Sequence, residues 1–253
     1  MADNPLTGAA YLLKGAALIK TPGLRRYVIL PLLINIAVFG ILGWLGLSWL
    51  GGYLDEQIQR LPEWLQWIEW LVWPLLGLAF LVVGFTLFTF VAGIIAAPFN
   101  ALLAETILRR AGALPDQAPE RPWHAALTEA GVAVREETRK LLYFLKWALP
   151  FGVLFLIPGV NLIAAPAWLG FNAWLLAQEY LDYPLSARGL AFSRQRPLLR
   201  RHRWLALGFG GATQLATAIP LLNLLVIPSA VAGACLLWLE QFPKAEDDDS
   251  LPP

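Results

Sequence analysis

The sequence predicts an all-α integral membrane protein with two long transmembrane helices, two re-entrant (partly penetrating) helical hairpins, and further amphipathic and cytoplasmic helices. Hydrophobic residues make up 58% of the chain and charged residues only 15%, a balance typical of membrane proteins. The charges cluster between long apolar runs, and two of these runs share the pattern Pro-x-x-Asn-Leu-x-x-x-Pro. We expect residues 1–253 to form a single membrane domain.

Residues 1–20 are expected to form a short amphipathic helix at the membrane interface, with a packed surface helix as the alternative. The apolar side chains that support a helix here are Tyr11, Leu12, Leu13, Ala16, Ala17 and Ile19. Lys14 interrupts this apolar stretch and no basic segment precedes it. We therefore expect no cleavable signal peptide here.

The segment 21–26, Thr-Pro-Gly-Leu-Arg-Arg, has the composition of an anion site. Thr21 is a good N-cap and Pro22 suits the first position of a helix. The free amides of Gly23, Leu24 and Arg25 would then point out of a helix start, where the dipole favours a negative charge. Gly23 leaves room for a ligand, and Arg25 and Arg26 supply fork-shaped donors. The alternative is a basic pair that serves only as a topology anchor.

Two long uncharged runs, over residues 27–54 and 70–104, predict the transmembrane spans, which we place over residues 27–54 and 70–108. A helix rises about 1.5 Å per residue, so each run is long enough to cross a bilayer. The connection over 55–69 is polar, and four tryptophans recur there every three residues, which is typical of an interfacial belt. They are Trp64, Trp67, Trp70 and Trp73. Residues 124–146 predict a cytoplasmic helix.

The two copies of the repeated pattern predict re-entrant hairpins over 147–180 and 204–240. In each copy the first proline ends a helix, and Asn161 or Asn223 is placed to cap the next one. Two full spans and a turn need about 43 residues, and both uncharged runs are shorter. Half-helix ends can form transport sites, so we expect Asn161 and Asn223 to line the pathway. Complete but short transmembrane hairpins remain the alternative.

The distribution of lysine and arginine predicts the orientation. Of the 19 basic residues, only Arg60 falls between the two long spans. The positive-inside rule assigns the other side, with all the remaining basic residues, to the cytoplasm. Both termini are then cytoplasmic, and both hairpins enter from that side. The acidic tail over 243–253 is expected to be disordered.

The sequence holds no enzyme motif that stands out. It lacks a Gly-rich phosphate loop with lysine, His-Glu-x-x-His and Gly-x-Ser-x-Gly. His124 and His202 have no partner at ligand spacing, so we expect no catalytic residue, metal or cofactor. Cys235 is the single cysteine, which rules out an internal disulfide. The carboxylates Glu105, Glu179 and Asp182 are expected to form structural ion pairs with nearby arginines.

Taken together, these features resemble the CysZ-type bacterial sulfate permeases, from about residue 11 to residue 240. The resemblance rests on Gly23-Leu24-Arg25-Arg26, Ala97-Pro98-Phe99-Asn100 with Glu105, Glu179-Tyr-Leu-Asp182-Tyr183-Pro184 and the two Pro-x-x-Asn-Leu copies. It implies sulfate uptake across the inner membrane for cysteine synthesis, with sulfate bound at residues 23–26. It also implies an oligomer built from dimers, with two full spans and two partly penetrating helical pairs per chain.

The expected partners are sulfate, with sulfite as a second candidate anion, the lipid bilayer and further copies of the chain, but no nucleic acid. A membrane scaffold or assembly protein without transport activity remains the alternative function. In that case the arginines would serve only topology and lipid headgroups. The driving force and the choice among sulfate, sulfite and thiosulfate are left open by the sequence.

Overall fold

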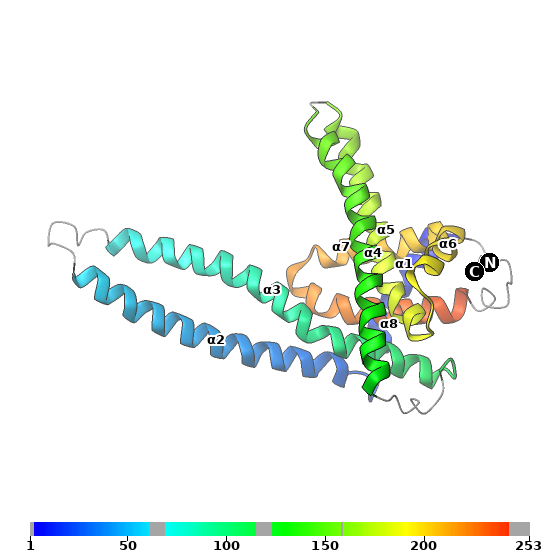
Figure 1. Ribbon diagram of the computed structural model, residues 1–253, viewed down its shortest axis with the longest axis horizontal. Helices are drawn as coiled ribbons and strands as arrows, with labels where there is room; N and C mark the ends of the chain where they lie inside the picture. Colours follow the sequence, from blue (N-terminus) through cyan, green and yellow to red (C-terminus); the bar gives the residue numbers. More distant parts are fainter. Residues whose placement is uncertain (1–2, 61–68, 115–122, 158, 243–253) are drawn as a thin grey trace. The chain divides into compact units, whose positions relative to one another are not determined.

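The computed structural model describes residues 3–60, 69–114, 123–157 and 159–242. The regular structure of these ranges is helical, without a strand. The helices are α1 (Pro5–Leu18), α2 (Arg26–Gln59), α3 (Glu69–Arg110), α4 (Trp123–Phe155), α5 (Asn161–Ala187), α6 (Phe192–Arg201), α7 (Arg203–Thr217) and α8 (Pro220–Gln241) (Figure 1). They divide into unit 1, from Met1–Arg25 and Asn100–Pro253, and unit 2, from Arg26–Phe99.

Unit 2 consists of α2 and the first part of α3, and both are strongly apolar. Large apolar side chains remain exposed along α2, including Trp44 at 70% and Trp49 at 72%. Such a surface suits lipid rather than water. Among the described residues, three segments are long and apolar enough to cross a membrane: Arg26–Tyr53, Val91–Arg110 and Leu222–Gln241. The chain is therefore an all-helical, multi-pass membrane protein.

The third of these segments differs from the sequence expectation, which placed residues 204–240 in a re-entrant hairpin. Leu222–Gln241 fills most of α8 and meets the same length and hydropathy requirements as a full span. Most of its residues are also buried within the protein. The burial arises because α1, α5 and α7 all pack against α8. Length and composition therefore allow either a full or a partial crossing for this helix.

Unit 1 is held together by glycines that bring helix backbones into close contact. Gly8 and Gly15 of α1 face the carbonyl groups of Leu205 in α7 and Ser229 in α8. Gly210 of α7 faces the backbone of α5 at Ala173. Small residues permit this close approach, which is how helices commonly associate in membranes. The centre of this core is the fully buried face of α8, formed by Ala230, Val231, Ala232, Ala234, Cys235 and Leu237.

A polar cluster joins α1 to the end of α8. Lys14 Nζ lies 2.6 Å from Glu240 Oε2, and the Tyr11 hydroxyl donates to the same oxygen at 2.7 Å. The Gln241 amide donates to the Tyr11 hydroxyl at 2.7 Å. The hydrogen bond to Glu240 raises the pKa of Lys14. Both charges are half exposed, so the ion pair contributes little to the free energy of folding. Packing at the glycines is therefore the main interaction that holds α1 against α8.

The helices break at both copies of the repeated pattern. One break separates α4, which ends at Phe155, from α5, and the other separates α7, which ends at Thr217, from α8. Figure 1 shows α4 and α5 running side by side up to their break. Aromatic contacts join them, since the ring of Phe151 lies 5.3 Å from that of Trp168 and 5.5 Å from that of Phe171.

The capping expected of the two asparagines is wrong. The N-cap residues are Val160 for α5 and Ile219 for α8, and neither helix has a side-chain cap. Asn161 is the first residue of α5, and Asn223 lies within the first turn of α8. In α8 the reason is Pro220, whose fixed backbone angle suits the first helical position and starts the helix earlier.

Two further features differ from the sequence expectation. Helix α4 continues through residues 146 and 147, where we expected a cytoplasmic helix to end and a hairpin to begin. Helix α6 forms within the basic link between the predicted hairpins, where we expected no helix. The tail over 243–253 and the tryptophans at 64 and 67 lie outside the described residues.

Candidate anion site

The segment between α1 and α2 is a hydrogen-bonded turn rather than a helix start at Pro22. The amides of Leu24 and Arg25 both donate to the Thr21 carbonyl, at 3.2 and 3.4 Å. The Thr21 hydroxyl donates back to the Leu18 carbonyl at 2.8 Å, so it does not cap α2. The expectation that the amides of Leu24 and Arg25 are free for an anion is therefore wrong. Helix α2 begins at Arg26, which moves the open helix-start amides to Arg26 and the residues after it.

Gly23 has a backbone angle φ of +87°, which favours glycine because a Cβ would be strained there. The guanidinium of Arg110 occupies the space beside it. Its Nη2 atom lies 2.5 Å from the position that a Cβ of residue 23 would take. Gly23 is thus needed both for the turn and for the approach of an arginine.

Arg110 is the functional candidate that the sequence analysis missed. It ends α3, and the helix finishes in a Schellman motif around Gly112, which has φ of +72°. The Ala113 amide donates to the Leu108 carbonyl at 2.9 Å, and the Gly112 amide to the Arg109 carbonyl at 3.0 Å. Leu108 is fully buried, so the end of α3 is anchored in unit 1 and holds Arg110 beside the turn.

The side chain of Leu24 anchors the turn from the other side. It is only 1% exposed, while its neighbours Arg25 and Arg26 are exposed. Arg26 turns onto the adjacent Tyr27, donating to its hydroxyl at 2.9 Å. Within the part of the chain that the structure describes, neither Arg25 nor Arg110 forms an ion pair. Their charges can therefore act on a solute anion.

Arg25 and Arg110, both in unit 1, give the site its chemistry, and Arg26 follows Arg25 directly in the sequence. A guanidinium offers planar, paired donors that match two oxygens of a tetrahedral anion. The local carboxylate, Glu105, lies 3.7 Å from Arg109 and balances that arginine instead. Because a guanidinium carries hydrogen-bond donors and no acceptor, the site suits an oxyanion.

The structure does not bring the other predicted residues to this turn. Asn161 and Asn223 lie at the beginnings of α5 and α8. Asp182 forms an ion pair with Lys140 at 2.6 Å, a lysine rather than an arginine. Glu179 is exposed on α5. Among the described residues, no three histidine, cysteine or acidic side chains gather in a way that could hold a metal ion.

Replacing Gly23 with alanine is expected to weaken anion binding about tenfold, because the new Cβ displaces the Arg110 guanidinium, and a hydrogen bond to a charged group is worth about 1.5–3 kcal/mol. Gly189→Ala is the matched control, since Gly189 has a similar φ of +79° with no atom within 4 Å of its would-be Cβ. Both variants should lose thermal stability, but only Gly23→Ala should lose sulfate affinity. Unchanged affinity in Gly23→Ala would remove Gly23 from the site.

Comparisons with known proteins place the chain in a family. The family model described as "Sulfate transporter CysZ/Etoposide-induced protein 2.4" matches residues 11–228. A Pseudomonas aeruginosa protein named Sulfate transporter CysZ is 42% identical over 239 residues, covering 93% of this chain and 96% of its own. A protein of the same name from Pectobacterium atrosepticum is 38% identical over 242 residues, covering 95% of this chain and 87% of its own. The chain therefore belongs to the Sulfate transporter CysZ/Etoposide-induced protein 2.4 family.

Proposed function

We propose that this protein is a sulfate permease that takes up sulfate across the bacterial inner membrane and supplies it for cysteine synthesis. Family membership and the names of its relatives support this function. The site assignment rests mainly on one observation: the guanidinium of Arg110 lies against Gly23. Gly23 is two residues before Arg25 in the sequence. The protein has the features of a transporter rather than of an enzyme.

Sulfate is bound, in this proposal, by the turn over residues 23–26 together with Arg110. The anion carries two negative charges and loses part of a strong hydration shell when it binds. Guanidinium donors can replace the lost water molecules. The desolvation free energy of the arginine is small because a guanidinium is itself weakly hydrated. Gly23 allows the guanidinium of Arg110 to approach the turn that carries Arg25, and the anion is proposed to bind the donors of these arginines. Leu24 contributes by anchoring the turn rather than by touching the anion.

The topology that we propose has full spans in α2 and α3, with the α4–α5 and α7–α8 pairs as re-entrant hairpins. Both termini are cytoplasmic, in agreement with the excess of basic residues outside the connection between α2 and α3. The exposed apolar side chains along α2 suit lipid and further copies of the chain, in an oligomer built from dimers. Structural ion pairs such as Lys140–Asp182 hold the hairpin helices in place.

The pathway is proposed to run past the two hairpin breaks. Asn161→Ala combined with Asn223→Ala is expected to reduce sulfate flux about thirtyfold, because each asparagine removed deprives the passing anion of one amide donor, worth about 1 kcal/mol. Binding at the turn over residues 23–26 should be unaffected. Flux is measured as uptake of radiolabelled sulfate into vesicles, beside the parent and the single variants. Unchanged flux in well-folded double variant would contradict this route.

Growth on sulfate tests the proposed function in cells. A bacterial strain without its own sulfate uptake, given sulfate as its sole sulfur source, should grow when this protein is produced. Cysteine in the medium should rescue the strain with or without the protein, which separates a sulfate defect from general toxicity. If the protein reaches the inner membrane and growth still fails, the alternative of a scaffold or assembly protein without transport activity gains support.

A further inference from the structure

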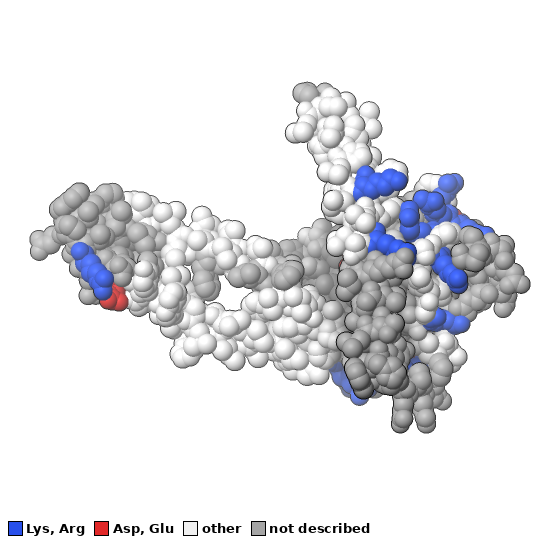
Figure 2. Space-filling model, in the orientation of Figure 1, with Lys and Arg blue, Asp and Glu red and all other residues white. Residues whose placement is uncertain are grey.

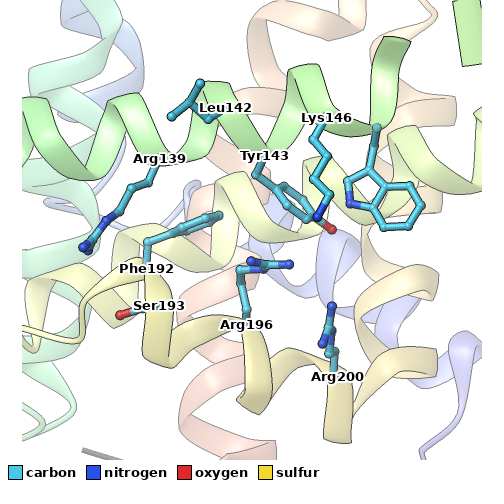
Figure 3. Close-up of a pocket in the computed structure, with 9 residues that line it drawn as sticks. Arg139, Leu142, Tyr143, Lys146, Phe192, Ser193, Arg196 and Arg200 are labelled. Atoms are coloured by element: carbon cyan, nitrogen blue, oxygen red, sulfur yellow. The ribbon is translucent and has the colours of Figure 1, made fainter. Parts of the chain in front are cut away.

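A basic pocket lies between α4 and α6, away from the turn over residues 23–26. Its cavity has a volume of about 380 Å³. Four cationic side chains line it, and the described lining contains no acidic residue: Arg139 and Lys146 come from α4, and Arg196 and Arg200 from α6. Figure 3 shows Lys146, Arg196 and Arg200 turned toward the space between the two helices, and Figure 2 shows lysines and arginines gathered on this face of unit 1.

Asp182 of α5 fixes both walls of this pocket. On one side Lys140 of α4 lies 2.6 Å from its Oδ2 atom. On the other side the amide of Gln195 in α6 donates to its Oδ1 atom at 2.7 Å and to the Leu190 carbonyl at 2.9 Å. Gln195 is only 1% exposed, whereas Lys140 and Asp182 are partly exposed, so these interactions are partly shielded from solvent. The positions of α4 and α6 are thus set by groups that take no part in lining the pocket.

Aromatic rings orient the central arginine of the pocket. The guanidinium carbon of Arg196 lies 4.1 Å from the centre of the Tyr143 ring and 6.0 Å from that of Phe192. The two rings themselves meet edge to face at 6.3 Å. Stacking restricts an arginine without using its N–H donors. Arg196 therefore presents paired donors toward the cavity, and Lys146 and Arg200 add charge beside it.

The neighbouring surface identifies the kind of anion. Lys146 is the last charged residue before the long uncharged part of α4. Leu142, which lines the pocket, is 62% exposed, and Leu149, two turns further along α4, is 64% exposed. Cationic side chains beside exposed apolar ones match a phosphate headgroup with its acyl chains. We propose that the α4–α6 pocket binds the phosphate headgroup of an anionic membrane lipid, independently of the sulfate site.

Native mass spectrometry of the purified full-length protein, titrated with phosphatidylglycerol, tests this inference. The parent should bind phosphatidylglycerol more tightly than phosphatidylcholine. Lys146→Gln combined with Arg196→Gln should weaken that binding roughly thirtyfold, at about fivefold per charge removed. Arg194→Gln combined with Arg201→Gln is the matched control: it removes the same charge from α6 residues that do not line the pocket, and should change affinity less than twofold. Lys146→Arg with Arg196→Lys should retain most of the binding.

Two further comparisons separate lipid from free oxyanion. Millimolar sulfate or inorganic phosphate should leave the bound phosphatidylglycerol in place, and Arg25→Ala with Arg26→Ala should bind lipid like the parent. Displacement by either free anion would overturn the lipid assignment in favour of a second oxyanion site. Equal loss of binding in the pocket variant and in the control variant would also overturn it, because the pocket would then be no different from the surrounding basic surface.

Discussion

Replacing Arg25 and Arg26 together with alanine is expected to lower sulfate affinity by at least about a hundredfold. A hydrogen bond to a charged group contributes about 1.5–3 kcal/mol, so losing two such groups removes about 3–6 kcal/mol of binding free energy. The protein should still fold, because both side chains are exposed and the buried Leu24, which anchors the turn, is unchanged. The measurement is equilibrium binding of radiolabelled sulfate to the purified protein.

The single variants and a charge-matched control make this result specific. Arg110→Ala should also weaken binding, because its guanidinium lies against Gly23. Arg194→Ala with Arg201→Ala removes the same charge from α6 and should leave sulfate affinity unchanged. If the Arg25/Arg26 double variant binds sulfate like the parent, the site lies elsewhere. If the control loses as much affinity as the double variant, the arginines act only through the overall electrostatic potential of the basic surface.

Gly210→Ala is expected to destabilise unit 1 severely, whereas Gly211→Ala, one residue further along α7, should be tolerated. A Cβ at residue 210 would overlap the Ala173 carbonyl oxygen and lie only 2.8 Å from its carbon and 2.9 Å from the Ala177 nitrogen. Because these are backbone atoms of α5, a whole helix would have to move. Overpacking of this kind costs about 1–3 kcal/mol and can cost more. A Cβ at residue 211 meets only the Ala173 methyl group, at 4.0 Å.

Thermal unfolding of the purified protein in detergent compares the two alanine variants directly. Gly210→Ala should unfold at a clearly lower temperature than the parent or elute as aggregate. Gly211→Ala should match the parent or exceed it, since alanine favours helix over glycine by up to about 1 kcal/mol. Equal stability of both variants would mean that α7 and α5 do not approach as closely as the structure has them.

The fold class follows from the sequence, because long apolar runs separated by clustered charges are compatible with few fold classes other than a helical membrane protein. The helix breaks within the two Pro-x-x-Asn-Leu copies were also expected, because a proline removes a backbone donor and disfavours a continuous helix. The second proline of each copy, Pro166 or Pro228, nevertheless lies inside a helix. The start of α2 was placed too early because a Thr-Pro pair fits an N-terminus, yet the left-handed Gly23 prevents helix there. Helix α6 was overlooked because its basic residues masked the helical spacing of Phe192, Gln195 and Leu199, which are buried.

The candidate site was predictable only in part. Gly23, Arg25 and Arg26 stand together in the sequence, and their chemistry points to an anion. Arg110 is distant in the sequence, and its place beside Gly23 depends on how the end of α3 is anchored by buried residues such as Leu108. Spacing along one chain cannot reveal such a contact. The glycine contacts of unit 1 could not be predicted for the same reason. The position of a glycine in the sequence does not indicate which helix backbone packs against it.

Uptake of radiolabelled sulfate into liposomes that contain only this purified protein is the most direct test of the proposed permease. We expect the parent to transport sulfate and the Arg25→Ala/Arg26→Ala variant to lose transport while remaining folded. Sulfite should be included as a competitor to define selectivity. Folded parent protein that carries no sulfate would contradict the claim that this chain forms a sulfate pathway by itself, and a double variant that still transports would contradict the site at the turn over residues 23–26.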